Sequence, residues 1–197
     1  MKRLLLLNIT LLLIVLFSNP HSKSTVSTQQ APGVFAITGA TLIDGSGRPP
    51  VGNSVVVVSG DSITAVGRAG SVKIPKDATI IDGRGLTITP GFIDTHNHSD
   101  RGLSDDPSAA TQVSQGITTI SIGQDGGSPL PVGEYLAKLD QNPVALNVLT
   151  FVGHATLRSK VMGDNTNRHA TPEEIEKMQT LVDLAMRDGA FGFQQAR

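Results

Sequence analysis

Two histidines separated by one residue, His96 and His98, form the pattern in this sequence that is best suited to chemistry. Side chains alternate between the two faces of a β-strand, so two residues at this spacing on a strand point the same way. Their imidazoles can then reach one cation, and imidazole nitrogen is a common ligand of divalent metals. The pattern therefore predicts a metal site at His96 and His98, with a pair of unrelated loop residues as the alternative.

Asp94 lies two residues before His96, so on a strand it would face the same side as the two histidines. We expect its carboxylate either to hold a ligating imidazole in place or to make an ordinary structural hydrogen bond. In a sheet of parallel strands flanked by helices, the histidines would lie at the carboxyl end of a strand, where the active sites of β/α barrels form.

Residues 91–197 have the alternation of strands and helices that such a sheet requires. The expected strands are residues 91–95, 117–122, 144–151 and 190–193. The expected helices are residues 106–116, residues 132–139 and a segment that starts after a capping box at Thr171 and ends near Gly189. This pattern indicates an α/β fold, namely the first four strands, approximately, of a TIM-type barrel.

Residues 33–90 contain short β-rich runs separated by turn dipeptides. Gly60 and Asp61 lie between two runs at hairpin spacing, which predicts a tight turn. The strand spacing is typical of a small β-sandwich. No histidine occurs between His21 and His96, so we expect no catalytic role for this segment.

The first 24 residues have the layout of a secretory signal peptide. A basic start is followed by an apolar run at residues 4–17, which is shorter than the roughly 20 residues of a membrane-spanning helix. Residues 25–32 are expected to be a flexible lead-in. The pattern predicts export to the periplasm or the medium without stable membrane insertion after cleavage, and an uncleaved anchor is the alternative.

Composition excludes several classes of protein and site. The 197 residues carry 16 Lys and Arg against 17 Asp and Glu, and this formal charge of −1 argues against a nucleic-acid partner. The chain has no cysteine, which excludes disulfides, thiol catalysis and zinc–thiolate sites.

Residues 90–98, PGFIDTHNH, resemble the signature of the amidohydrolase superfamily, and residues 81–86, IDGRGL, resemble the usual entry to its barrel. Three further stretches make the chain most similar to the N-acyl-D-amino-acid deacylases, or D-aminoacylases: residues 115–119, 153–158 and 170–174. The resemblance implies a hydrolase of non-peptide amide bonds that uses a divalent metal, usually zinc, to activate water. Its substrate would be a small molecule, an N-acyl amino acid.

The resemblance also assigns roles to individual residues. His96 and His98 are implied metal ligands, and Asp125 stands where many members of the family have a cysteine ligand. A carboxylate oxygen can bind zinc, so we expect Asp125 either to be a third ligand or to be a simple turn residue. His154 and Arg158 are expected on the active face, as substrate-binding residues. Arg158 would hold a carboxylate with two hydrogen bonds, unless it is an ordinary surface arginine.

Length conflicts with a complete enzyme of this family. Residues 90–197 number 108, whereas an eight-stranded barrel needs about 250 residues. The implied general-base carboxylate would lie beyond Arg197. We therefore expect the 197-residue chain to be a truncated, inactive fragment.

Two other functions are kept as alternatives. Dihydroorotases, hydantoinases and deaminases of the same superfamily share the first histidine motif, so the substrate could be a cyclic amide or an amine. The chain could also be a non-catalytic secreted β-domain with a remnant of a barrel.

Overall fold

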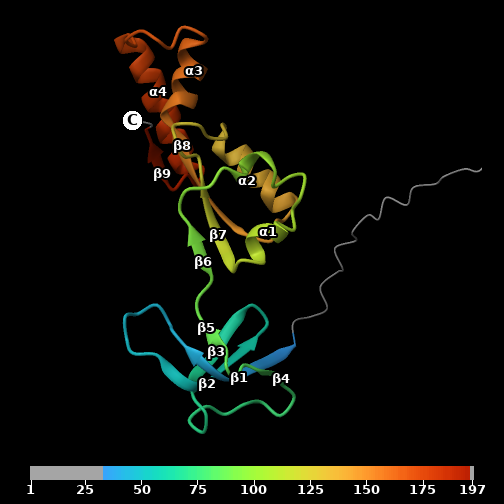
Figure 1. The fold of residues 1–197 in the computed structure, drawn as a ribbon. Coiled ribbons are helices and arrows are strands. Elements are labelled where there is room, and N and C mark those ends of the chain that lie inside the picture. The colour runs from blue at the N-terminus through green and yellow to red at the C-terminus, as the bar shows by residue number, and fades with distance from the viewer. Residues whose placement is uncertain (1–32, 196–197) are drawn as a thin grey trace, which may run out of the picture.

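Figure 1 shows the computed structural model of the chain, which describes residues 33–195. Its strands form two sheets, one from residues 34–88 and the other from residues 92–194. The expected signal peptide and lead-in, residues 1–32, lie outside the described residues. Within the described part of the chain, no helix combines the length and the apolar character that crossing a bilayer requires.

The first sheet has five strands: β1 (Val34–Leu42), β2 (Val51–Ser59), β3 (Ser62–Arg68), β4 (Thr79–Asp82) and β5 (Thr87–Ile88). The strand order is β3-β2-β1-β4, and β5 also pairs with β1. β1 runs antiparallel to β2 but parallel to β4 and β5. Ala36, Val55 and Val57 form its buried core.

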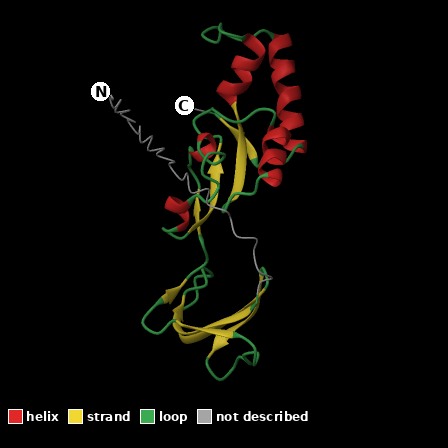
Figure 2. Cartoon of the chain, turned by 90° about the vertical axis from the view of Figure 1, so that its right-hand side faces the viewer, coloured by secondary structure: helices red, strands yellow, loops and turns green. Residues whose placement is uncertain are grey.

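The tight turn predicted at Gly60 and Asp61 is confirmed, because Ser59 pairs with Ser62 across the antiparallel β2–β3 hairpin. The β-sandwich predicted for residues 33–90 is not confirmed. Residues 34–42 form one long strand, β1, whose pairing with β2 shifts between Thr38 and Ala40 and again between Ala40 and Leu42. The described strands of this segment form one curved layer in Figure 2, and no second layer faces it there.

The second sheet has four parallel strands in chain order: β6 (Phe92–Asp94), β7 (Ile117–Ile122), β8 (Asn147–Gly153) and β9 (Gly192–Gln194). This order confirms the predicted α/β class and is consistent with the opening strands of a β/α barrel. Because the strands are parallel, their carboxyl ends meet at one edge of the sheet. The segments that follow β6, β7 and β8 therefore start close together.

Short helices follow β6, and a longer one follows β7. They are the 3₁₀ helix η1 (Ser99–Arg101), α1 (Ala110–Val113) and α2 (Val132–Gln141). The helix predicted at residues 106–116 is wrong for most of its length. The Asp106 carboxylate accepts bonds from the backbone and hydroxyl of Ser108, and Ala109 has a left-handed φ of 43°, so the helix begins only at Ala110.

Two helices, α3 (His154–Met162) and α4 (Pro172–Arg187), connect β8 to β9 and lie side by side in Figure 1. The predicted capping box is confirmed: the Thr171 hydroxyl accepts from the Glu174 backbone N–H, and the Glu174 carboxylate accepts from that of Thr171. Helix α3 was not predicted. Both helices pack on β8 through a cluster that includes Val152, Leu157 and Met178.

Candidate metal centre

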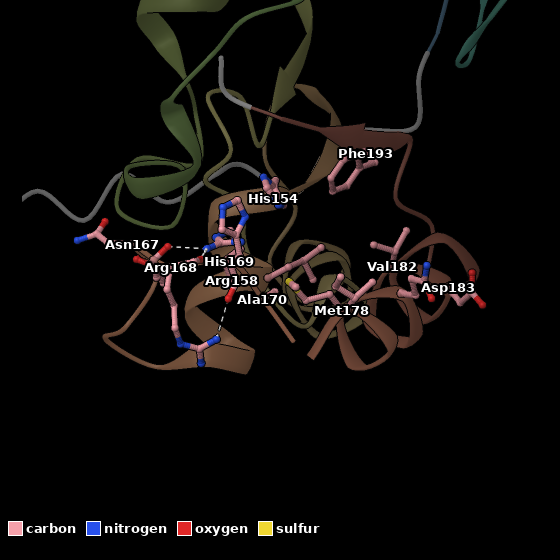
Figure 3. A pocket seen from close by; sticks show the side chains of 14 residues that line it. His154, Arg158, Asn167, Arg168, His169, Ala170, Met178, Val182, Asp183 and Phe193 are labelled. Carbon is pink, nitrogen blue, oxygen red and sulfur yellow. Dashed lines mark hydrogen bonds between the residues drawn. The ribbon is translucent and has the colours of Figure 1, made fainter. Parts of the chain in front are cut away.

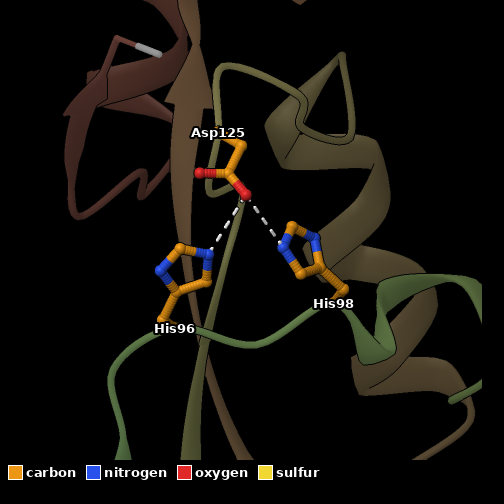
Figure 4. Close-up of side chains that lie close together, drawn as sticks. All are labelled: His96, His98 and Asp125. Atoms are coloured by element: carbon orange, nitrogen blue, oxygen red, sulfur yellow. Dashed lines mark hydrogen bonds and ion pairs between the residues drawn. The ribbon is translucent and has the colours of Figure 1, made fainter. Parts of the chain in front are cut away.

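The two histidines lie beyond the strand on which they were expected. β6 ends at Asp94, and His96 and His98 follow in an irregular segment. The prediction that strand alternation aligns them is therefore wrong, although both side chains still point the same way (Figure 4).

Local hydrogen bonds take the place of strand geometry. The Asp94 carboxylate accepts from the His96 backbone N–H at 3.2 Å and from the Asn97 side-chain amide at 2.6 Å. The Asn97 side-chain oxygen accepts from the Ser99 backbone N–H at 2.8 Å, and the Asn97 backbone N–H donates to the Ser121 carbonyl. Asp94 and Asn97 thus fix the path of the backbone on either side of both histidines.

Asp125 reaches the same place from the loop that follows β7. Residues Gly123, Asp125 and Gly126 all have left-handed φ angles, of 83°, 56° and 78°. Glycine adopts this conformation freely, and aspartate tolerates it better than most residues with a side chain. An added Cβ at Gly123 would lie 2.5 Å from the Phe151 carbonyl oxygen, so the loop follows the backbone of β8 closely.

The three side chains converge on one point (Figure 4). Nε2 of His96 and Nε2 of His98 each lie 3.2 Å from the same oxygen of Asp125, Oδ2. One ligand atom from each residue lies within 4.8 Å of the others. The side chains are 57, 58 and 64% exposed, so a cation can reach them from solvent.

This donor set fits a divalent cation. Two ligands of a tetrahedral ion, each bound at about 2.1 Å, lie about 3.4 Å apart, which is close to the 3.2 Å between each imidazole nitrogen and Asp125 Oδ2. Imidazole nitrogen and carboxylate oxygen suit zinc and other first-row divalent ions. Among the described residues, no lysine or arginine pairs with Asp125, so its charge is free to meet a cation.

Two amide side chains near this centre were not predicted as functional residues. Asn97 holds the histidine segment through side-chain bonds to Asp94 and Ser99. Gln124 is buried, with 7% of its surface exposed, and bonds to the backbone next to His96. Asn97 lies between the two histidines, and this position was the one sequence signal that could have drawn attention to it.

A cavity of about 550 Å³ is lined by two of the three ligand candidates, His98 and Asp125. Its wall includes His98, Asp125, Arg101 and Tyr135. The Tyr135 hydroxyl is buried and has no hydrogen-bond partner among residues 33–195. Burial, with a smaller effect of Asp100, raises the pKa of Tyr135. Tyr135 is therefore a neutral hydrogen-bond donor near neutral pH.

His154 and Arg158 line a second, larger cavity of about 850 Å³ between α3, α4 and β9 (Figure 3). The His154 ring meets the Phe193 ring edge to face, with 5.9 Å between centroids. Arg158 Nη2 donates to the carbonyls of Thr166 and Arg168, at 2.5 and 2.6 Å. Arg158 thus holds the α3–α4 loop, and its binding of a substrate carboxylate stays a prediction.

Comparisons with known proteins can be set against this geometry. The sequence profile of the amidohydrolase family matches residues 79–197. An N-acyl-D-aspartate deacylase of Alcaligenes xylosoxydans xylosoxydans is 37% identical over a 193-residue alignment that covers 86% of this chain and 38% of that enzyme. A D-aminoacylase from the same organism is 36% identical over 184 residues, or 82% of this chain and 37% of the enzyme. The chain thus spans about two fifths of the length of these relatives.

Solved structures of enzymes of the same kind resemble this chain in fold. An N-acyl-D-glutamate deacylase from Bordetella bronchiseptica, complexed with zinc and a phosphonate inhibitor, has a TM-score of 0.73 at 32% identity. That match covers 84% of this chain and 38% of the deacylase. A D-aminoacylase with a binuclear metal centre has a TM-score of 0.72 at 34% identity, covering 82% of this chain and 38% of that one.

Proposed function

Since this chain belongs to the amidohydrolase family, we propose that it carries a divalent-metal centre for the hydrolysis of an amide carbon–nitrogen bond. The convergence of His96, His98 and Asp125 at the carboxyl edge of the parallel sheet carries the proposal. We propose zinc as the ion, because catalytic zinc is held by three protein ligands of these types and keeps a further position open.

Each residue of the centre has a distinct part in this proposal. When bound, the cation supplies an electrophile that acidifies water and polarises a carbonyl group. His96 and His98 act as neutral imidazoles that present Nε2, and Asp125 adds one negative charge. Asp94 and Asn97 hold the histidine segment, so little rearrangement is needed when the cation binds.

We propose an N-acyl-D-amino acid as the substrate class. The proposal is supported by the similarity to deacylases of N-acyl-D-aspartate and N-acyl-D-glutamate and to a D-aminoacylase. His154, which follows β8 directly and lines the larger cavity, is proposed to contact the substrate. Cyclic amides are the alternative class, because the same superfamily includes enzymes that hydrolyse them.

A zinc titration of the metal-free 197-residue protein tests the metal centre. We expect saturable binding that is lost in a variant with His96→Ala and His98→Ala. His169→Ala is the matched control, since His169 is exposed and lies outside the three-residue cluster. Absence of saturable zinc binding, or equal binding by the double variant, would contradict the proposal.

Ligand binding to the zinc-loaded protein tests the substrate class. Saturation-transfer NMR should detect N-acetyl-D-aspartate more strongly than N-acetyl-L-aspartate, because an enzyme site distinguishes the two through its fixed contacts. Binding without a preference for the D form would contradict the proposed substrate. Selective binding of dihydroorotate or hydantoin would favour the cyclic-amide alternative.

A further inference from the structure

Gln124 is a buried side chain between the two segments that carry the candidate metal ligands. It directly precedes Asp125, and 7% of its surface is exposed. Its Nε2 donates to the Thr95 carbonyl at 2.9 Å and to the Ser121 hydroxyl at 3.1 Å. Thr95 directly precedes His96. One amide group therefore joins the residue before Asp125 to the residue before His96.

The orientation of this amide follows from its partner. A backbone carbonyl oxygen only accepts hydrogen bonds, so the nitrogen of the Gln124 amide must face Thr95. A buried amide that lost this partner would carry the cost of an unsatisfied polar group. The bonding therefore favours a single arrangement of the side chain.

The loop that contains Gln124 needs such a constraint. Three of its residues, Gly123, Asp125 and Gly126, have left-handed φ angles, and glycine is free to adopt others. The histidine segment has its own support from Asp94 and Asn97. That support ties the histidines to each other and to β7, but it does not reach the Asp125 loop.

We propose that Gln124 is a positioning residue that holds Asp125 at ligand distance from His96 and His98 before a cation binds. The inference rests on the proposed metal centre. Partners that orient metal ligands change affinity by about 10- to 100-fold when they are removed. Gln124 acts through Thr95 and Ser121 and needs no contact with the cation.

Gln124→Met tests this role, because methionine has a similar length and shape but donates no hydrogen bond. We expect the dissociation constant for zinc, measured by competition with a chromogenic chelator, to rise about 10- to 100-fold. The visible absorption of bound Co²⁺, which reports coordination geometry, should change with it. Gln115→Met is the matched control, since Gln115 is exposed and, among the described residues, its side chain bonds only to the carbonyl of Thr111, four residues earlier. It should leave both readouts unchanged.

Thermal unfolding of the metal-free proteins separates positioning from general stability. A lower midpoint for Gln124→Met with an unchanged zinc dissociation constant and Co²⁺ spectrum would overturn the inference. Ser121→Ala removes one of the two acceptors and should give a smaller loss of affinity. If Gln124→Met does not fold, this variant decides: weaker zinc binding supports the role, and unchanged binding overturns it. Failure of the unaltered protein to bind zinc would instead overturn the proposed metal centre, and this inference with it.

Discussion

Gly153, the last residue of β8, lies directly against Gly126 in the loop that carries Asp125. A Cβ added to Gly153 would overlap the carbonyl group of Gly126. The same carbonyl accepts a hydrogen bond from the Thr156 backbone N–H, at 3.1 Å, in the first turn of α3. The position of Asp125 therefore depends on the absence of a side chain at Gly153, the residue that directly precedes α3.

Replacing Gly153 with alanine should disturb both stability and metal binding. The added methyl group meets backbone, which cannot rotate away, so the Asp125 loop must shift. We expect Gly153→Ala to lower the free energy of unfolding by about 1–3 kcal/mol, as overpacking does, and to weaken zinc binding. Urea unfolding and zinc titration measure the two effects. Gly52→Ala is the control, since an added Cβ there meets no atom within 4 Å. Unchanged zinc affinity in Gly153→Ala would contradict this account.

Changing Asp125 to cysteine should change the metal preference of the centre. The donor set of two imidazoles and one carboxylate contains no soft ligand, and the chain has no cysteine. Thiolate favours soft ions, so Asp125→Cys should raise the affinity for Cd²⁺ relative to Mn²⁺. The Co²⁺ form of this variant should also gain a thiolate charge-transfer band in the near ultraviolet.

A cysteine placed elsewhere controls for non-specific thiol binding. Ser46→Cys adds one to an exposed turn in the first segment of the chain. A similar rise in Cd²⁺ affinity in Ser46→Cys would show that the gain in Asp125→Cys is non-specific thiol binding, and would contradict the prediction.

Features with a local cause were predictable from the sequence. β7 matches its expected range because residues 117–122 are an unbroken β-prone run. Helix α4 starts where predicted because Thr171 and Glu174 complete a capping box within four residues. Helix α3 was missed because residues 154–162 carry no apolar stripe, and its position depends on the burial of Leu157 and Met162 against other elements.

The three candidate ligands could be named from the sequence, but the bonds that hold them together could not. The spacing of His96 and His98 pointed to one cation, yet side-chain bonds from Asp94 and Asn97, not strand alternation, align them. Gln124 reaches Thr95, 29 residues away in sequence. A contact at that separation exists only once β6 and β7 have paired, so no local pattern indicates it.

Arg158 should prove important for the α3–α4 loop. Its Nη2 donates to the carbonyls of Thr166 and Arg168, so one charged guanidinium group makes two hydrogen bonds to the backbone of the loop. We expect Arg158→Met to lower the free energy of unfolding by about 1.5–3 kcal/mol, the range for hydrogen bonds to charged groups. Hydrogen exchange in residues 164–170 should become faster. Lys160→Met, an exposed change on the same helix, should do neither. If Arg158→Met leaves hydrogen exchange in the loop as slow as in the unaltered protein, Arg158 does not hold the loop, and substrate binding is then its expected role.

Low pH should destabilise the N-terminus of α4 by protonating the Glu174 carboxylate. Arg168 donates to both oxygens of Glu174, at 2.6 and 2.7 Å, and the Thr171 backbone N–H donates at 2.8 Å. The bonds from Arg168, followed by that from Thr171, lower the pKa of Glu174 from 4.5 to about 2. As the pH falls, the Glu174 carboxylate is protonated in the unfolded chain, at a pKa of 4.5, before it is protonated in the folded chain. The stabilisation by Glu174 is therefore complete above pH 4.5. It falls as the pH drops from 4.5 and is lost below about pH 2.

Glu174→Gln isolates this contribution from the other carboxylates that titrate in acid. Glutamine can still meet the Thr171 N–H but carries no charge for Arg168, so the variant should unfold at a lower temperature than the unaltered protein near neutral pH. The difference between the thermal unfolding midpoints of the variant and the unaltered protein should decrease as the pH is lowered from about 6 to about 2.5. Protonation of Glu174 removes the same negative charge that the substitution removes. Glu176→Gln, exposed on the same helix, should show no such convergence. A gap that stays constant over this range would mean that the ion pair with Arg168 does not stabilise the folded chain.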